Sequence, residues 1–379
     1  MKIVIAPDSF KGSLTAREAA QSIESGILRV LPEAECVSIP MADGGEGTVQ
    51  SLVDATGGRI MRVLVTDPLG HPTNAEYGIL GDGRTAVIEM AAASGIQYID
   101  ETTRNPLIAT TYGTGELIKD ALEQGVSDII VGLGGSATND GGAGMAQALG
   151  VRLLDDDGAP LPFGGAALAE LSEVDVSGLD PRLADVRIRL ASDVTNPLTG
   201  VRGASAVFGP QKGATPDMVE RLDDALAHYA AVIRKQLGRE VETVPGAGAA
   251  GGLGAGFLAF TEASMRSGVD LVIEATGLAG LAAGADYCFT GEGGIDFQTQ
   301  YGKTPMGVAR AVKQASPDCT VVALAGSIGE GIDQLYDLGI DAIFGIMPSV
   351  STMRDAVDHA ADNLARTAEN VARLLARNL

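Results

Sequence analysis

The stretch that most constrains the fold is the glycine-rich segment Val131–Gly150, where an apolar run leads into a polar loop and then a helix-forming sequence. Apolar residues from Ile129 onward end at Gly134-Gly135, and Met145–Leu149 has helical composition. A strand, a glycine-rich loop and a helix start in this order allow backbone N–H groups to bind an anion, most often phosphate. A tight strand-to-helix turn that binds nothing would give the same pattern, and this alternative stays open.

Length, composition and charge narrow the class of protein. The chain has 379 residues, of which 45% are hydrophobic and 20% charged, as in globular proteins of two or three domains. The 51 glycines suit an α/β protein with many strand-to-helix turns. The net charge of −22 opposes binding to nucleic acid or anionic membranes, so we expect neither as a partner. An anionic substrate would need local Lys, Arg or metal.

The cysteines and histidines do not indicate a metal or disulfide protein. No CxxC is present, and the cysteines lie in or beside apolar runs, so we expect buried free thiols at Cys36, Cys288 and Cys319. The histidines lack the spacing of zinc ligands; they are His71, His228 and His359. Met1-Lys2 leads directly into a strand, and the apolar runs are too short to span a membrane, so we expect a soluble, cytoplasmic protein.

Both ends of the chain repeat the pattern of a short apolar strand followed by a helix. Ile3–Ala6 is a continuous apolar run, typical of a strand buried on both faces of a parallel sheet. Thr15 begins a helix, with Glu18 placed to complete a capping box. Near the C-terminus the expected elements are Ala285–Thr290, Met306–Ala315, Thr320–Leu324, Ala342–Ile346 and Met353–Leu375. We therefore expect both ends to form one Rossmann-like domain.

The middle of the chain is expected to form an inserted domain. An antiparallel meander is predicted for Ile60–Thr66, Asn74–Leu80 and Thr85–Met90, ahead of the glycine-rich loop. A helix is predicted for Met218–Leu237, and a packed turn or helix start for Gly246–Gly256. The predicted fold is α/β in two domains: residues 1–65 plus 285–379, and an inserted domain of mixed sheet, 66–284. Ligands of open α/β sheets bind beyond the carboxyl ends of strands, so we expect the active site in the cleft between the domains.

Three segments place carboxylates beside glycines at expected strand or helix ends: Asp43–Gly47, Asn139–Gly144 and Glu292–Asp296. Such turns suit Mg²⁺ held together with substrate phosphates, because Mg²⁺ takes one or two carboxylates and keeps several waters. Asp and Gly also favour turns and caps without any ligand. Neither a Walker A motif nor GxGxxG after the first strand is present, which argues against a P-loop or a plain NAD enzyme.

Five motifs in order resemble class I glycerate kinase over nearly the whole chain: Ala6–Ser13, Met41–Thr48, Gly134–Gly144, Ser192–Pro197 and Gly291–Thr299. The resemblance implies a flavodoxin-like domain with a second α/β domain inserted. It also implies transfer of phosphate from ATP to D-glycerate, giving 2-phosphoglycerate rather than the 3-phospho isomer. The chain departs from the family at Gly294 and Phe297, where Arg and Ser are common, so the resemblance does not extend to a cation in this segment.

Phosphoryl transfer depends on positioning and charge neutralisation, which suggests roles for the polar residues. Lys11 is the first candidate for a phosphate or carboxylate contact, ahead of Arg202, Lys212 and Lys303. Asp193 is our candidate base, with Asp8 second. Asp43, Glu292 and Asp296 are expected to position Mg²⁺. The expected substrate and phosphate contacts are Gly134, Gly135, Ser136, Thr138, Asn139, Asp140, Gly141, Gly142, Asn196 and Lys303.

Two other functions fit the same residues. One is a kinase for another small hydroxy acid or polyol, and the other is a non-catalytic sensor of a phosphorylated metabolite. Carboxylates at several strand ends favour catalysis over sensing. The expected partners are therefore ATP, Mg²⁺ and D-glycerate, with the protein acting as a monomer or a homodimer.

Overall fold

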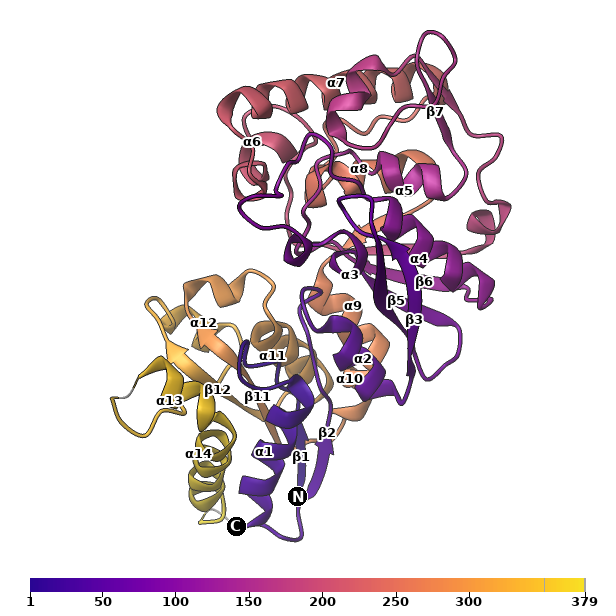
Figure 1. The fold of residues 1–379 in the computed structure, drawn as a ribbon. Coiled ribbons are helices and arrows are strands. Elements are labelled where there is room, and N and C mark those ends of the chain that lie inside the picture. The colour runs from indigo at the N-terminus through magenta and orange to yellow at the C-terminus, as the bar shows by residue number, and fades with distance from the viewer. Residues whose placement is uncertain (351, 378–379) are drawn as a thin grey trace. The chain divides into compact units, whose positions relative to one another are not determined.

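The computed structural model describes residues 1–350 and 352–377, which form two compact units (Figure 1). Unit 1 contains Met1–Asp43, Gln50–Gly58 and the described residues from Ser267 onward; unit 2 contains Gly44–Val49 and Arg59–Arg266. The ranges expected from sequence divide the chain at other points, after residues 65 and 284. Residues 59–65 lie in unit 2 because they pair within its sheet, and residues 267–284 lie in unit 1.

Unit 1 is built on a parallel sheet of order β13-β12-β11-β1-β2. Its strands are β1 (Lys2–Ile5), β2 (Glu35–Ser38), β11 (Tyr287–Ile295), β12 (Thr320–Ile328) and β13 (Ala342–Gly345). Its helices are α1 (Ala16–Leu28), α9 (Gly268–Thr276), α10 (Leu278–Leu281), η5 (Phe297–Gln300), α11 (Thr304–Ala315), α12 (Asp333–Asp337), α13 (Met353–Asp358) and α14 (Ala360–Leu375). Helix α2 (Thr48–Thr56) begins in the unit 2 segment and continues into unit 1.

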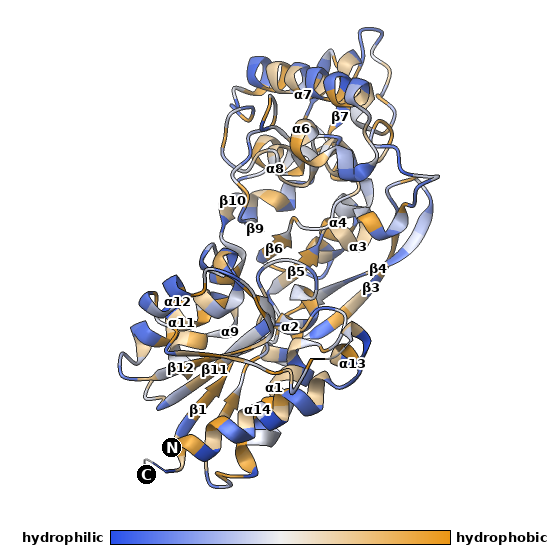
Figure 2. Ribbon diagram, turned by 90° about the vertical axis from the view of Figure 1, so that its left-hand side faces the viewer, coloured by the Kyte–Doolittle hydropathy of each residue, from blue (hydrophilic) through white to orange (hydrophobic). Residues whose placement is uncertain are grey.

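Helix α1 forms as its sequence predicts. The Thr15 hydroxyl accepts the Glu18 N–H while the Glu18 carboxylate accepts the Thr15 N–H, which completes the capping box. Its apolar side chains are buried against the sheet and α14, and Figure 2 shows hydrophilic residues on the outer faces of both helices. Gly26 allows the close approach, because a Cβ there would lie 2.0 Å from the Ala365 carbonyl oxygen.

Unit 2 contains a mixed sheet of order β10-β9-β6-β5-β4-β3. Its strands are β3 (Arg59–Thr66), β4 (Pro72–Ile79), β5 (Thr85–Glu89), β6 (Asp128–Gly132), β9 (Arg187–Ala191) and β10 (Ser264–Arg266), and a separate ribbon pairs β7 (Arg152–Leu154) with β8 (Glu173–Asp175). The predicted meander is confirmed, since β3 to β5 pair antiparallel. Strands β5, β6, β9 and β10 pair parallel.

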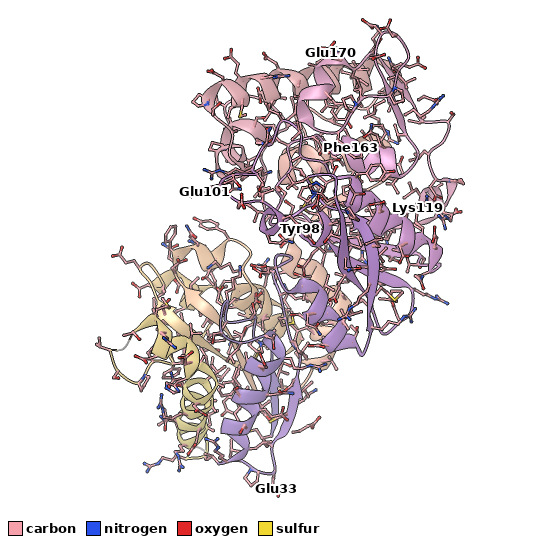
Figure 3. The ribbon with its side chains drawn as sticks, viewed as in Figure 1. Glu33, Tyr98, Glu101, Lys119, Phe163 and Glu170 are labelled. Atoms are coloured by element: carbon pink, nitrogen blue, oxygen red, sulfur yellow. The ribbon has the colours of Figure 1, made fainter. Side chains whose placement is uncertain are left out.

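The helices of unit 2 are α3 (Ala91–Ser94), η1 (Ile96–Tyr98), α4 (Tyr112–Glu123), α5 (Ala143–Ala148), η2 (Gly165–Glu170), η3 (Pro181–Asp185), α6 (Ala204–Phe208), η4 (Pro210–Lys212), α7 (Pro216–Leu237) and α8 (Ala249–Phe260). The ring of Phe163 packs against the ring of Tyr112 at the start of α4, with 5.0 Å between the ring centroids; Phe163 is labelled in Figure 3. The glycine tract at 246–256 forms a packed helix start as predicted, with left-handed backbone at Ala250, Gly251 and Gly252.

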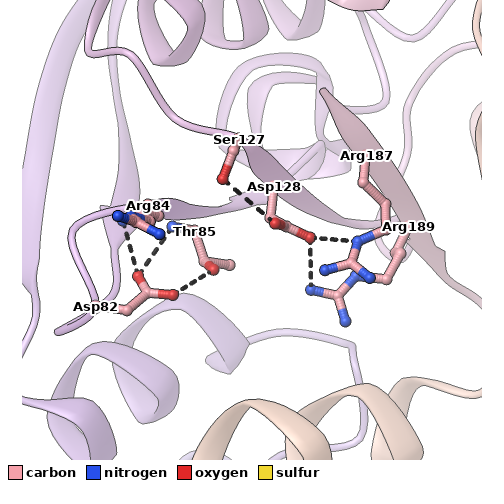
Figure 4. Close-up of polar contacts among 7 residues, drawn as sticks. All are labelled: Asp82, Arg84, Thr85, Ser127, Asp128, Arg187 and Arg189. Carbon is pink, nitrogen blue, oxygen red and sulfur yellow. Dashed lines mark hydrogen bonds and ion pairs between the residues drawn. The ribbon is translucent and has the colours of Figure 1, made fainter. Parts of the chain in front are cut away.

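Charged side chains fix the amino ends of the parallel strands of unit 2 (Figure 4). The Asp128 carboxylate accepts Arg187 Nε at 2.6 Å and a terminal Arg189 nitrogen at 3.3 Å. Asp82 accepts the Arg84 and Thr85 N–H groups, each at 2.9 Å. Because the Gly134 loop follows the opposite, carboxyl end of β6, this cluster supports the sheet rather than the candidate site.

Two sequence predictions are wrong in detail. A single helix was expected over Met353–Leu375, but α13 ends at Asp358 and α14 starts at Ala360, because His359 leaves the helical conformation (φ −112°, ψ 16°). Cys36 is half-buried, since β2 lies at the sheet edge, while Cys288 and Cys319 are buried; all three are free thiols.

Within residues 1–350 and 352–377, no helix is long and apolar enough to cross a membrane.

Candidate active site

Asp8 lies just beyond the carboxyl end of β1, where backbone pairing with β11 continues. Its N–H donates to the Gly291 carbonyl at 2.9 Å, which fixes the loop. The carboxylate is 8% exposed and accepts the Thr304 hydroxyl at 2.5 Å and the Ser9 N–H at 2.6 Å. Burial raises the pKa of Asp8 to about 6, and the Thr304 hydrogen bond opposes this. Asp8 is thus a carboxyl group that can take up a proton near neutral pH.

Glu292 stands near the carboxyl end of the adjacent strand β11. Its carboxylate lies 3.6 Å from the Lys303 ammonium and accepts the Thr299 hydroxyl at 3.4 Å. Burial raises the pKa of Glu292 to about 7; Lys303 lowers it, whereas the charges of Asp8 and Asp43 raise it. Lys303 is the N-cap residue of α11, and its ammonium also donates to the Gly294 carbonyl at 3.4 Å.

Asp8, Asp43 and Glu292 form what we call the carboxylate cluster. Asp43 follows the end of β2 and is held there because the Met41 N–H donates to the Pro7 carbonyl at 3.0 Å. The charge of Asp43 raises the pKa of both other members, so the three groups repel one another. A divalent cation with its phosphate ligands would relieve this repulsion, and hard carboxylate oxygens suit Mg²⁺.

Asp296, the other expected metal ligand, has a local structural contact. It is the N-cap of η5, and its carboxylate accepts the Gln298 N–H at 2.8 Å. Among the residues that the structure describes, no group of three or more His, Cys, Asp or Glu side chains is placed to hold a metal ion by itself. Any Mg²⁺ here would need phosphate or water ligands in addition to one or two carboxylates, which is its usual coordination.

Lys11 is exposed on the loop that follows Asp8. This loop packs on β11, since a Cβ at Gly293 would lie 3.6 Å from the Lys11 backbone nitrogen. The positive charge of Lys11 acts to lower the pKa of Asp8. Unit 1 therefore brings Lys11 and Lys303 to the same edge of the sheet as the carboxylate cluster, as the sequence predicts for strand ends.

In unit 2, the Gly134–Gly144 loop follows β6 and divides into an exposed start and a buried remainder. Gly134 and Gly135 are exposed, and Ser136 is 8% exposed. From Thr138 to Asp140 the side chains are fully buried. Gly141 and Gly142 are also buried, with left-handed backbone at φ 65° and 76°. Only the first part of the loop thus presents backbone N–H groups to solvent.

Asp140 occupies the start of α5 itself. Its carboxylate accepts the N–H groups of Thr111, Gly142 and Gly144 at 2.8–3.2 Å, and also the Thr111 hydroxyl at 2.8 Å. These four bonds oppose the effect of burial, which raises the pKa of Asp140. The anion at this helix N-terminus is therefore a side chain of the protein.

Lys212 is the buried cation next to this loop. It is 1% exposed, and its ammonium donates to the Thr138 carbonyl at 2.6 Å. Burial lowers the pKa of Lys212 to about 7, against the attraction of Asp140. The Asn139 side-chain NH2 donates to the Ser205 hydroxyl at 2.9 Å, while the Asn139 side-chain oxygen and the Thr138 hydroxyl are buried without a hydrogen-bond partner.

The remaining candidates lie beyond the end of β9. Asp193 is exposed on the segment that follows this strand. Asn196 is half-buried and organises a turn: its side chain donates to the Arg202 carbonyl at 2.7 Å, and its own carbonyl accepts the Gly248 N–H at 3.0 Å. Arg202 is exposed.

Sequence reasoning missed two residues that hold the buried carboxylates in place, Thr304 and Thr111, and a third, Glu89, that fixes the start of a helix. Thr304 was visible as the first residue of a Thr-Pro helix start after Lys303, but its contact with Asp8 joins positions 296 residues apart. Thr111 binds Asp140 from 29 residues away. Glu89, at the end of β5, accepts the Val49 N–H at 2.9 Å and so caps the start of α2.

Comparison with known proteins gives a consistent result. A model of the "Glycerate kinase family" matches residues 3–376. A glycerate kinase of Bacillus subtilis (strain 168) is 55% identical over 372 residues, covering 98% of this chain and 97% of the relative. A glycerate 2-kinase of Escherichia coli (strain K12) is 51% identical, covering 99% and 98%. A crystal structure of a proposed glycerate kinase 2 from Salmonella typhimurium LT2 superposes with a TM-score of 0.92 at 51% identity, covering 100% and 99%.

Proposed function

Because this chain belongs to the glycerate kinase family and is an enzyme that phosphorylates glycerate, we propose that its phosphoryl donor is ATP and its product 2-phosphoglycerate. The observation that carries the proposal is the carboxylate cluster beside two lysines at the carboxyl edge of the unit 1 sheet. The name of the Escherichia coli relative supports the 2-hydroxyl as acceptor. Family membership also removes the sensor and the kinase for another substrate as alternatives.

Asp8 is the general base in this proposal, and Asp193 is the second candidate. A base that works near neutral pH needs a pKa close to the operating pH, and burial gives Asp8 a pKa of about 6. Asp8 accepts the proton of the glycerate hydroxyl as the oxygen attacks the terminal phosphorus and the bond to the ADP oxygen breaks. Thr304 holds the Asp8 carboxylate in position.

Asp43 and Glu292 would hold Mg²⁺, which neutralises charge on the nucleotide phosphates. Asp296 has a supporting role as the cap of the η5 turn. Lys11 and Lys303 bind the anionic groups of the two substrates, which a chain of net charge −22 would otherwise repel.

The Gly134–Gly142 loop acts through its exposed start in this proposal. Backbone N–H groups of Gly134 and Gly135, together with the Ser136 hydroxyl, contact a substrate oxyanion. The buried remainder of the loop keeps this start in position; it consists of Thr138, Asn139, Asp140, Gly141 and Gly142. Asn196 stabilises the turn that follows Asp193. The enzyme would work in the cytoplasm, where ATP is supplied.

The test is to incubate the protein with ATP, Mg²⁺ and D-glycerate and to identify the product by phosphorus NMR. We expect 2-phosphoglycerate and ADP in equal amounts, and loss of turnover when EDTA removes Mg²⁺. A 3-phosphoglycerate signal would contradict the proposed acceptor hydroxyl, and turnover unchanged by EDTA would contradict the metal. The turnover of Asp8→Asn and of Asp193→Asn, measured under the same conditions, decides between the two candidate bases: the variant that loses turnover identifies the base.

A further inference from the structure

A pocket of about 400 Å³ lies within unit 1, beyond the carboxyl ends of the parallel strands and against α13. This volume is within the range of roughly 300–1,000 Å³ that small-molecule sites occupy. The wall is mainly apolar and is formed by Phe10, Ile346, Met353, Ala356, Val357 and Ala360. Phe10, Ile346 and Ala360 are buried at 2–4% exposure, so much of this wall belongs to the packed body of the unit.

Polar groups also line the pocket: the side chains of Lys11, Ser13, Ser327, Ser349 and Thr352, and the backbone of Gly293 and Gly326. Ser13 donates to the Val357 carbonyl at 3.3 Å, which ties the Lys11 loop to α13. Gly293 and Gly326 lie in close contact, since a Cβ at Gly326 would be 2.6 Å from the Gly293 carbonyl oxygen. The pocket thus joins an apolar wall to the edge where the carboxylate cluster and Lys11 stand.

We propose that this pocket binds the base and ribose of the nucleotide, with the phosphates directed past Lys11 toward the carboxylate cluster. The inference rests on the proposed function, because it takes ATP as the donor. Of the two substrates, only the nucleotide has a flat face that gains from apolar contact. Glycerate has three carbons that all bear oxygen, so burying it against Phe10, Ile346 and Val357 would strip its hydration without replacing it.

The arrangement also explains how one loop serves both parts of the nucleotide. Phe10 faces the apolar wall, Lys11 is one of the polar groups that line the pocket, and Asp8 precedes them in the carboxylate cluster. This one loop therefore carries a residue for each part of the reaction: Phe10 for the base, Lys11 for the phosphates and Asp8 for the acceptor hydroxyl. Ligands at the carboxyl edge of a parallel sheet follow the same general placement.

The test narrows the pocket with Ala356→Trp and measures ADP binding by isothermal titration calorimetry. Ala361→Trp is the matched control, because Ala361 is the exposed residue next to Ala360 and does not line the pocket. We expect the Kd for ADP to rise at least about tenfold in Ala356→Trp and to stay within about twofold in Ala361→Trp. The KM for ATP should follow the Kd, while the KM for glycerate should not change.

Equal ADP affinity in wild type and Ala356→Trp would overturn the proposal, as would the absence of ADP binding to wild type. Photolabelling of unaltered protein with 8-azido-ADP gives an answer that does not depend on folding of the variant. Label in the peptides that line the pocket, 10–13 or 346–360, supports the site, and label found only outside the lining residues overturns it. The proposed function fails separately, if wild type binds ADP in this pocket but does not phosphorylate glycerate with ATP.

Discussion

The surroundings of Asp8 in unit 1 and of Asp140 in unit 2 differ, and the difference distinguishes a carboxylate suited to the reaction from one that stabilises the fold. Both are aspartates that follow a parallel strand, and both are buried. Asp140 is fully enclosed and accepts four hydrogen bonds from its own loop and from Thr111. Asp8 accepts two and faces the like charges of Asp43 and Glu292. A buried carboxylate whose contacts are complete stabilises the fold, whereas one beside like charges is suited to bind a cation or a proton.

Asp8→Asn is expected to have the largest effect on activity. An amide cannot accept the substrate proton, so kcat/KM should fall by about 10²- to 10⁴-fold. The free energy of unfolding should change by less than about 1 kcal/mol, because the amide oxygen can still accept the Ser9 N–H, the amide NH2 can donate to the Thr304 hydroxyl, and a buried charge is lost. Coupled ADP release and urea unfolding measure the two quantities. A near-normal rate would remove Asp8 from the reaction and leave Asp193 as the base.

Asp140→Asn makes the same chemical change at the enclosed carboxylate of unit 2, where we expect it to lower the stability of the fold. One oxygen becomes a donor that faces N–H groups, so between one and three of the four hydrogen bonds are lost inside the core. At about 1–3 kcal/mol for each unsatisfied buried group, we expect the free energy of unfolding to drop by about 3 kcal/mol. Urea midpoints measured beside Asp8→Asn give the comparison directly. Unfolding curves that coincide for the two variants would contradict the distinction.

The same distinction decides which parts of the candidate site could be predicted from the sequence alone. Strand ends that carry Asp8, Asp43 and Glu292 could be found because apolar runs are local and parallel strands share one carboxyl edge. The direction of each side chain could not be found, since it depends on contacts between distant residues. The glycine loop shows this: its composition predicts an anion site, but not that the Asp140 carboxylate lies at the start of α5, where Thr111, 29 residues away, donates to it. The helix break at His359 was missed because the apolar pattern continues across it.

Lys212 offers a pH test of the enclosed region. Burial lowers its pKa to about 7 from an ordinary value of 10.5, so above pH 7 the unfolded chain holds a proton that the folded chain has released. The free energy of unfolding must then rise with pH, by up to about 1.4 kcal/mol per pH unit from this group. Between pH 7 and 8.5 the free energy of unfolding of wild type should rise, relative to that of Lys212→Met, by about 1 kcal/mol or more. Urea unfolding at each pH measures this difference. A difference that does not vary with pH would show that the Lys212 pKa is not lowered.

Thr304→Val tests the carboxylate cluster by the smallest change, since it removes one hydroxyl and keeps the shape. The Thr304 hydrogen bond lowers the pKa of Asp8, so its loss should raise that pKa and keep Asp8 protonated to higher pH. A hydrogen bond of about 0.5–1.5 kcal/mol corresponds to a shift of about one pH unit or less. The acid limb of the kcat/KM profile should therefore move to higher pH, with the rate at pH 8 nearly unchanged. Thr304→Ser should restore the original profile, because the serine hydroxyl can donate to the same oxygen. An acid limb that stays in place in Thr304→Val would mean that it reports another group, with Glu292 the next to substitute, because burial places its pKa at about 7.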